Sequence, residues 1–464
     1  MKLVVIGGVA AGTKAASRAK RVGGDELEVV VYQADRDTSM SECGLPYYVS
    51  GLVGEREALI ARTPEEFAGR GVSVKVRHRV ERIDPEGKTL TVRDLDADST
   101  FRDRYDRLIV ATGAESVDLP VPGADLEGVF TLRSVTDADR IRAYIREHAP
   151  ERAVVVGGGY IGLEMAENLR ELGMAVAVVE AGPRVAPTYG QEISDRVREH
   201  LQKHGVSVHT CASAEEISCA PNGENGEGAE QVSTVRFEDT ELPADLVLVG
   251  IGVRPVTALA EEAGMKVGET GAIEVDEHMR TNLPDVWACG DCVQTVNRVS
   301  GAATWLALGD VANKMGRVAG TNAATGEPTL RFPGVLGTGI FKVFDLGVGA
   351  SGLSEEEARE AGFEPMCVEV EANDKAGYYP GAEPVLFRMI ADRESGRVLG
   401  AEAVGAGVDK LIDVTATAIW GGLACDDLVN VDLAYAPPFG PALSPVIQAA
   451  TVLSGRVRGA DKGD

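Results

Sequence analysis

The sequence predicts an α/β protein with two parallel-sheet units, followed by a C-terminal unit of mixed strands and helices. Two glycine-rich turns, at residues 7–12 and 157–162, each lie between a short apolar run and an amphipathic stretch. The order of strand, glycine turn and helix is typical of Rossmann-like units. After residue 325 the alternating runs "GIFKVFDLGVGAS", "PVLFRMIAD" and "VLGAEAVG" precede helical segments, which predicts an α+β unit.

Length and composition limit the class of protein. The chain has 464 residues, too many for one core, so two or three domains are expected. Its formal charge of −26 repels phosphate backbones, so no nucleic-acid partner is expected. No apolar run reaches the ~18 residues of a membrane span. The apolar N-terminus is interrupted by glycines, which is typical of a first strand and not of a signal peptide. The seven cysteines are irregularly spaced and do not resemble the disulfide framework of a secreted protein. We therefore expect a cytoplasmic protein without membrane association.

The first glycine turn follows the strand expected at residues 3–6. Glycines here allow the backbone to approach a pyrophosphate at a helix N-terminus. Val9 replaces the middle glycine of G-x-G-x-x-G, so this match is partial. The next strand, "ELEVVVYQ", ends in Gln33 and is followed by Ala34, and a glutamine can bind a ribose through its amide oxygen. The turn itself comprises Gly7, Gly8, Val9, Ala10, Ala11 and Gly12.

The second glycine turn has the full G-x-G-x-x-G pattern. Glu180 ends the following strand, where a carboxylate accepts a hydrogen bond from the 2′-hydroxyl of NAD and repels the 2′-phosphate of NADP. Arg184 lies close enough in sequence to weaken that preference. For both turns the alternative is a glycine-rich turn that binds no nucleotide. The residues of this turn are Gly157, Gly159, Tyr160, Ile161 and Gly162.

Further motifs lie at predicted strand ends. Thr112 and Gly113 occur in "LIVATGA", Gly252 in "GIGVRP", and Gly290 and Asp291 in "TNLPDVWACGD". With the two glycine turns, this set resembles the FAD-dependent pyridine-nucleotide oxidoreductases. The resemblance implies FAD in the first unit, NAD(P)H in the second, and an aspartate that binds the ribityl chain of FAD.

Cys43 lies in "TSMSECGLPYY" at a predicted helix start. In the disulfide reductases of this family a second cysteine stands five residues earlier, where this chain has Thr38. Ser39-x-x-x-Cys43 instead resembles the single-cysteine branch, which contains coenzyme A disulfide reductases, NAD-dependent persulfide reductases, NADH peroxidases and NADH oxidases. The segments 305–326, which contains Ala307, 375–381 and 409–439 also match this branch.

The environment of Cys43 is expected to affect its pKa in two directions. A helix N-terminus and the adjacent flavin should lower the pKa and favour the thiolate. Glu42 stands where relatives have a neutral polar residue, and its charge should raise the pKa.

Within the branch, peroxidases and water-forming oxidases carry a histidine where this chain has Ala10. Tyr435, and Tyr378 or Tyr379, match tyrosines that in coenzyme A disulfide reductases cross a dimer interface to protonate the leaving thiolate. Phe439 replaces a further tyrosine of some relatives. The resemblance therefore implies a homodimer that reduces a sulfur–sulfur bond.

Coenzyme A is the small thiol that the resemblance implies. Ser39 and Glu42 are expected beside it, and Arg18 and Arg21 are candidates for its 3′-phosphate, although generic surface arginines are an alternative. An NADH oxidase or peroxidase on the same scaffold, or a flavoprotein redox sensor in which Cys43 only regulates, remain alternative functions.

We predict an FAD domain at 1–116 and 247–324, an NAD(P)H domain at 117–246, and a dimerisation domain at 325–464. The polar segment 220–231 is expected to be a surface loop.

Two pairs of residues have metal-site spacing but are not assigned to a metal site. Cys289-x-x-Cys292 lacks a second pair and is expected to be structural. His200 and His204 lack an evident third ligand, and a solvent-exposed helix face is expected. Glu164 matches a residue near the nicotinamide pocket of relatives, or is an ordinary helical glutamate.

Overall fold

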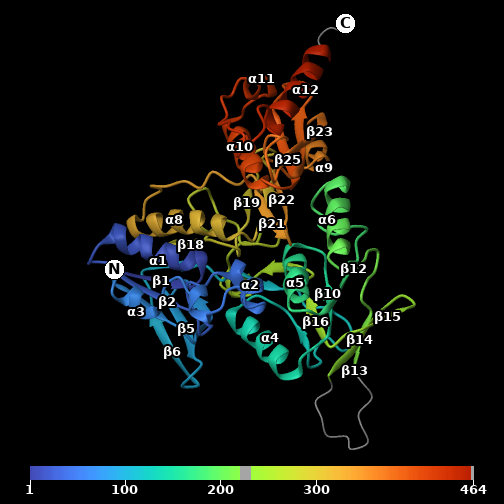
Figure 1. The fold of residues 1–464 in the computed structure, drawn as a ribbon. Helices are drawn as coiled ribbons and strands as arrows, with labels where there is room; N and C mark the ends of the chain where they lie inside the picture. The colour runs from blue at the N-terminus through green and yellow to red at the C-terminus, as the bar shows by residue number, and fades with distance from the viewer. Residues whose placement is uncertain (220–230, 461–464) are drawn as a thin grey trace, which may run out of the picture.

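The computed structural model describes residues 1–219 and 231–460 and contains three large sheets (Figure 1). Two sheets are parallel and belong to the units that carry the glycine turns, and the third is antiparallel and C-terminal. The predicted α/β class is therefore confirmed. The predicted loop 220–231 lies outside the described residues, apart from Gln231.

The first sheet has the strand order β18-β7-β1-β2-β3, and all its pairings are parallel. Its central strands are Val-rich runs buried on both faces, as expected for strands of a sheet that is covered on two sides. The strands are β1 (Lys2–Ile6), β2 (Glu28–Tyr32), β3 (Val72–Lys75), β7 (Arg107–Val110) and β18 (Val286–Ala288).

Helices α1 (Ala10–Gly23) and α8 (Gly309–Thr325) pack closely against each other, although about 300 residues separate them in sequence (Figure 1). A Cβ built on Gly316 would lie 2.3 Å from the carbonyl oxygen of Ala11, and one on Gly320 would lie 2.2 Å from that of Ala15. Only glycine permits this approach. The contact joins the two chain segments that form the first unit.

Smaller elements surround the first sheet. An antiparallel sheet consists of β4 (His78–Asp84), β5 (Thr89–Asp94) and β6 (Ser99–Arg104). The segment after β2 forms η1 (Glu42–Gly44), α2 (Leu45–Val49), η2 (Arg56–Leu59) and α3 (Pro64–Ala68). Two-stranded pairs and a short helix complete the unit: β8 (Ala114–Ser116) with β17 (Val253–Pro255), β19 (Thr295–Val296) with β20 (Ala303–Thr304), and α7 (Ala258–Glu262).

The second sheet has the order β12-β11-β10-β16-β9 and is also parallel. Its strands are β9 (Val129–Phe130), β10 (Arg152–Val156), β11 (Ala175–Val179), β12 (Val206–His209) and β16 (Leu246–Val249). The predicted domain boundary at 246/247 falls inside β16, all of which pairs in this second sheet. The accompanying elements are α4 (Val135–His148), α5 (Tyr160–Glu171), α6 (Gln191–Lys203), β13 (Glu216–Cys219), β14 (Val232–Phe237) and β15 (Thr240–Pro243).

The C-terminal sheet has the antiparallel order β21-β22-β25-β24-β23. Strand β25 is buried along its whole length because the C-terminal helices α10 and α12 pack on the sheet and α6 of the second unit also contacts β25. The elements are β21 (Gly339–Val343), β22 (Leu346–Gly352), α9 (Glu355–Glu360), β23 (Pro365–Asn373), β24 (Pro384–Asp392), β25 (Val398–Gly405), α10 (Val408–Gly421), α11 (Cys425–Leu428) and α12 (Pro445–Ala460). This unit lies against α5 through β21 and against α6 through β21, β22 and β25 (Figure 1).

None of the helices in the described residues has the length and apolar character needed to cross a membrane.

Candidate active site

The first glycine turn connects β1 to α1 and cannot carry side chains at two positions. A Cβ on Gly7, whose φ is 101°, would lie 2.0 Å from the carbonyl oxygen of Ala111, and a Cβ on Gly12 would lie 1.9 Å from that of Gly7. The side-chain oxygen of buried Gln33 accepts a hydrogen bond from the Gly8 N–H at 2.8 Å. The amide oxygen predicted to contact a ribose therefore also holds the turn.

The second glycine turn, between β10 and α5, repeats this arrangement. A Cβ on Gly162 would lie 2.1 Å from the carbonyl oxygen of Gly157. Glu180 accepts N–H groups with both carboxylate oxygens, from Gly158 at 2.7 Å and from Gly182 at 2.7 Å. Glu180 and Gln33 thus occupy equivalent places in the two units.

Both turns fit the pyrophosphate of a dinucleotide. In the described part of the chain, no side chain caps the N-terminus of α1 or of α5. Their first N–H groups are therefore available to an anion. A Cβ built on Gly159 or Gly113 meets no protein atom within 4 Å, so these backbones border open space. Residues 7–12 would hold one dinucleotide and residues 157–162 the other.

Most of the remaining predicted cofactor residues follow strand ends at one edge of the first sheet. Parallel strands bring their carboxyl ends together there. Thr112 donates its hydroxyl to the carbonyl oxygen of Val256 at 2.7 Å, which connects the end of β7 to the β17 segment. The residues at or near this edge are Ala34 and Ser39 after β2, Thr112 and Gly113 after β7, Gly290 and Asp291 after β18, Gly252 before β17, and Ala307 before α8.

Cys43 lies in the 310 turn η1, which the first glycine turn holds in place. The hydroxyl of buried Thr38 donates to the carbonyl oxygen of Gly8 at 2.7 Å, and the Ser39 N–H donates to the same oxygen at 2.8 Å. Beyond Cys43, α2 packs against α4 and α5 of the second unit through residues such as Leu45. Cys43 is exposed, on a segment between the two parallel-sheet units.

The polypeptide raises the pKa of Cys43, contrary to the expected lowering by a helix N-terminus. The main cause is that surrounding protein withdraws the thiol from water, although the residue as a whole is exposed. The charges of Glu164 and then Glu42 raise it further, while Arg133 lowers it. A backbone hydrogen bond at Cys43 lowers the pKa but is outweighed, since only a three-residue 310 turn and the five-residue α2 follow Ser41. The expected lowering by a bound flavin stays a prediction. The predicted effect of Glu42 is confirmed.

Glu42 belongs to a chain of charges that the sequence did not reveal. Arg133 lies 3.1 Å from Glu42 and 2.9 Å from Asp291, and it donates to the carbonyl oxygen of Ala114 at 3.1 Å. Burial raises the pKa of Glu42 to about 7 and also raises that of Asp291, while Arg133 opposes both shifts. Arg133 precedes α4, far from either partner in sequence, and a lone loop arginine gives no signal of this role.

Glu164 lies on α5 and faces the Cys43 segment. Its carboxylate accepts a hydrogen bond from the Tyr47 hydroxyl at 3.3 Å. Burial raises the pKa of Glu164 to about 7, and the charge of Glu167 adds to the shift. Glu167 is paired with Lys342 from β21, whose ammonium lies 5.6 Å from the Tyr47 ring centre. The structure therefore places Glu164 in the electrostatic environment of the thiol.

Tyr160 lies at the first turn of α5, above the second glycine turn. Its hydroxyl lies 2.9 Å from that of buried Tyr189, and its ring centre lies 4.8 Å from that of Phe341 on β21. The C-terminal unit thus contributes to the surroundings of Tyr160, next to the second glycine turn.

The predicted tyrosines lie in the C-terminal unit and are exposed. The pKa of Tyr378 is raised, mainly by its neighbour Tyr435. Tyr379 is less exposed than Tyr378. Within the described residues, no hydrogen bond joins any of the three to Cys43. Phe439 is 73% exposed, and further exposed apolar side chains in this unit are Trp420, Val431 and Leu443.

The two predicted phosphate-binding arginines differ in their surroundings. Arg18 donates to the Thr321 hydroxyl on α8 at 2.9 Å, whereas Arg21 is exposed. Cys289 and Cys292 are fully buried, and the Cys292 thiol lies 3.7 Å from the carbonyl oxygen of Val110. They pack in the core of the first unit, as predicted.

Comparison with known proteins identifies the family. The pyridine nucleotide-disulphide oxidoreductase model matches residues 1–316, and the dimerisation-domain model of the same family matches residues 339–446. The chain belongs to this family. Membership implies FAD and NAD(P)H as cofactors and confirms the family that the sequence resembles.

Individual relatives cover nearly the whole chain. An NAD(P)H sulfur oxidoreductase (CoA-dependent) of Pyrococcus furiosus is 38% identical, over 97% of this chain and 99% of the relative. The structure of an NAD-dependent persulfide reductase from A. fulgidus is 43% identical with a TM-score of 0.93, over 99% of this chain and 84% of that one. The structure of reduced CoADR-RHD from Bacillus anthracis is 37% identical with a TM-score of 0.93, over 99% of this chain and 81% of that one.

Proposed function

We propose that this protein reduces the sulfur–sulfur bond of a coenzyme A disulfide or persulfide at the expense of NAD(P)H, with Cys43 as the exchanging thiol. The observation that carries the proposal is the position of Cys43. It is an exposed thiol between the two parallel-sheet units, and Thr38 stands where an internal disulfide partner would be. The partner sulfur must then come from a small thiol.

The exchange follows from ordinary thiol chemistry. The Cys43 thiolate attacks one sulfur of the substrate, a mixed disulfide forms, and the other sulfur leaves as a thiolate. Bound FAD and NAD(P)H would supply the two electrons that cleave the mixed disulfide and restore the thiolate. A neutral tyrosine hydroxyl can protonate the leaving thiolate, and Tyr435, a neighbour of Tyr378, is the candidate.

We propose further that two subunits share each active site. The tyrosines belong to the segment that matches the dimerisation-domain model, and they are exposed together with Phe439 and Leu443. An exposed apolar surface of this kind supports an interface with a second copy of the chain. The tyrosines of one subunit would then reach Cys43 of the other.

The test is a mass spectrum of the native protein together with an anaerobic turnover assay. We expect a coenzyme A adduct on Cys43, and loss of disulfide reduction in Cys43→Ser. Cys211→Ser, which removes another exposed thiol, is the matched control and should retain full activity. Rapid NADH consumption under air that Cys43→Ser leaves undiminished would instead favour the oxidase.

A further inference from the structure

Two histidines and an aspartate meet at the C-terminal end of α6. His200 and His204 come from this helix end, and Asp345 comes from the turn between β21 and β22. One ligand atom from each residue lies within 4.8 Å of the other two. The Nε2 atoms of His200 and His204 lie 2.8 Å and 4.0 Å from Oδ1 of Asp345. The third ligand that was not evident in the sequence is therefore present in the fold.

We propose that His200, His204 and Asp345 bind a divalent transition-metal ion such as Zn²⁺ or Co²⁺. Imidazole nitrogens and a carboxylate oxygen are a usual ligand set for these ions, and three protein ligands leave a position for water. Metal–ligand bonds of about 2 Å require the donor atoms to draw together, and Asp345 is exposed, so its side chain has room to move.

The orientation of His204 favours this role. Its Nδ1 lies 3.0 Å from the carbonyl oxygen of His200, and because a carbonyl only accepts, Nδ1 carries the proton. The lone pair of the neutral ring is then on Nε2, the atom nearest Asp345. Metal-binding histidines typically donate their other N–H in this way. The ring also stacks on Phe344 at 4.0 Å and 8°, which fixes its plane.

The Nε2 atom of His200 is also available to bind a metal. Its Nε2 is buried, and in the described residues it makes no hydrogen bond of acceptable geometry despite its closeness to Asp345. Its ring centre lies 4.5 Å from that of His204, which keeps the two imidazoles together at the end of the helix.

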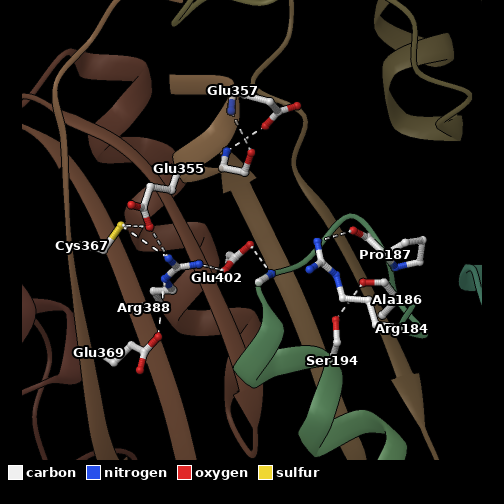
Figure 2. Close-up of polar contacts among 12 residues, drawn as sticks. Arg184, Ala186, Pro187, Ser194, Glu355, Glu357, Cys367, Glu369, Arg388 and Glu402 are labelled. Atoms are coloured by element: carbon white, nitrogen blue, oxygen red, sulfur yellow. Dashed lines mark hydrogen bonds and ion pairs between the residues drawn. The ribbon is translucent and has the colours of Figure 1, made fainter. Parts of the chain in front are cut away.

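The proposed site would complete the attachment of α6 to the C-terminal sheet. At the start of α6, the Gly190 N–H donates to Glu402 at 3.0 Å, and Glu402 is paired with Arg388 at 3.1 Å. Figure 2 shows Arg388 among Glu355, Glu369 and Glu402 beside this helix start. A metal at the other end would fasten the same helix to the β21–β22 turn.

The experiment is a titration of the metal-depleted, FAD-containing protein with Co²⁺, followed by calorimetry and visible absorption. We expect one equivalent per chain, with a nitrogen–oxygen spectrum that lacks thiolate-to-cobalt charge transfer. His204→Ala and Asp345→Asn should each weaken binding at least about tenfold. His148→Ala is the matched control, since His148 lies 3.7 Å from a carboxylate of Glu127, and it should bind Co²⁺ like the wild type.

Asp345→Asn keeps the test independent of folding because the residue is exposed. A second readout is hydrogen exchange, where metal should protect residues 191–204 and 339–352 in the wild type and not in Asp345→Asn. Equal Co²⁺ affinity in all variants, a thiolate spectrum, or binding only at millimolar concentrations would overturn the proposal.

Discussion

Glu42, the residue before Cys43, forms an ion pair with Arg133 at 3.1 Å. The pair couples the thiol segment to the loop before α4, and Arg133 continues to Asp291 at 2.9 Å. The negative charge of Glu42 raises the pKa of Cys43, whereas the positive charge of Arg133 lowers it. The two partners therefore act on the thiol in opposite directions.

Replacing Glu42 by glutamine should activate Cys43. The substitution removes a charge that raises the thiol pKa and leaves Arg133 less neutralised, so both effects favour the thiolate. We expect alkylation of the reduced, cofactor-loaded protein by iodoacetamide at about pH 8.5, above the Glu42 pKa of about 7, to be several-fold faster in Glu42→Gln. Glu57→Gln, an exposed change on η2, should react like the wild type. An unchanged or slower rate in Glu42→Gln would contradict the electrostatic account.

Glu164 should make stability depend on pH. Its pKa is about 7 in the folded protein against 4.5 for the isolated group, so the folded state binds the proton more tightly. This stabilisation is complete below pH ~4.5 and is lost as the pH rises through about 7. We expect the free energy of unfolding of the wild type to fall by up to about 3 kcal/mol, relative to Glu164→Gln, between pH 4.5 and 8.

Denaturant unfolding at several pH values measures this difference. Glu171→Gln, an exposed change on the same helix, is the control and should follow the wild type throughout. A parallel pH dependence in wild type and Glu164→Gln would show that this carboxyl does not titrate as described.

Single substitutions in the two glycine turns should affect flavin binding and NADH binding separately. Gly12→Ala places a Cβ 1.9 Å from the Gly7 oxygen, and Gly162→Ala places one 2.1 Å from the Gly157 oxygen. We expect Gly12→Ala to lose flavin absorbance on purification. Gly162→Ala should retain flavin and bind NADH at least about tenfold more weakly.

Gly54→Ala is the control for these variants because its Cβ would meet no atom within 4 Å. Flavin content and NADH titration are the two measurements. Loss of flavin from Gly162→Ala alone would reverse the assignment of the two turns.

The sequence predicted the parts of the fold that depend on local patterns. Buried Val-rich runs, glycine turns and strand-end residues are contiguous in the chain, so β1, β2, β10 and both turns could be located. The predicted boundary at 246/247 falls inside β16, whose apolar run continues to Val249 and ends before Gly250.

Contacts between distant segments could not be predicted in this way. Arg133 reaches Glu42 and Asp291 only once α4 has been placed beside the first sheet, and Asp345 reaches His200 only across two units. For the same reason, the sequence did not reveal that the surrounding polypeptide raises the pKa of Cys43. Its main determinants are burial and Glu164, which come from the packing of α2 against α5.

Tyr435→Phe should separate the two half-reactions of the enzyme. The phenol is proposed to protonate the leaving thiolate, so its loss should slow turnover with coenzyme A disulfide by about 100-fold, the lower end for general acids because a thiolate leaves readily. Flavin reduction by NADH does not involve this proton and should keep its rate in stopped-flow measurements. Tyr379→Phe is the comparison variant, because Tyr378 is the neighbour of Tyr435 that its pKa identifies. Equal slowing of both steps in Tyr435→Phe would indicate a structural effect on the interface and would remove Tyr435 as the acid.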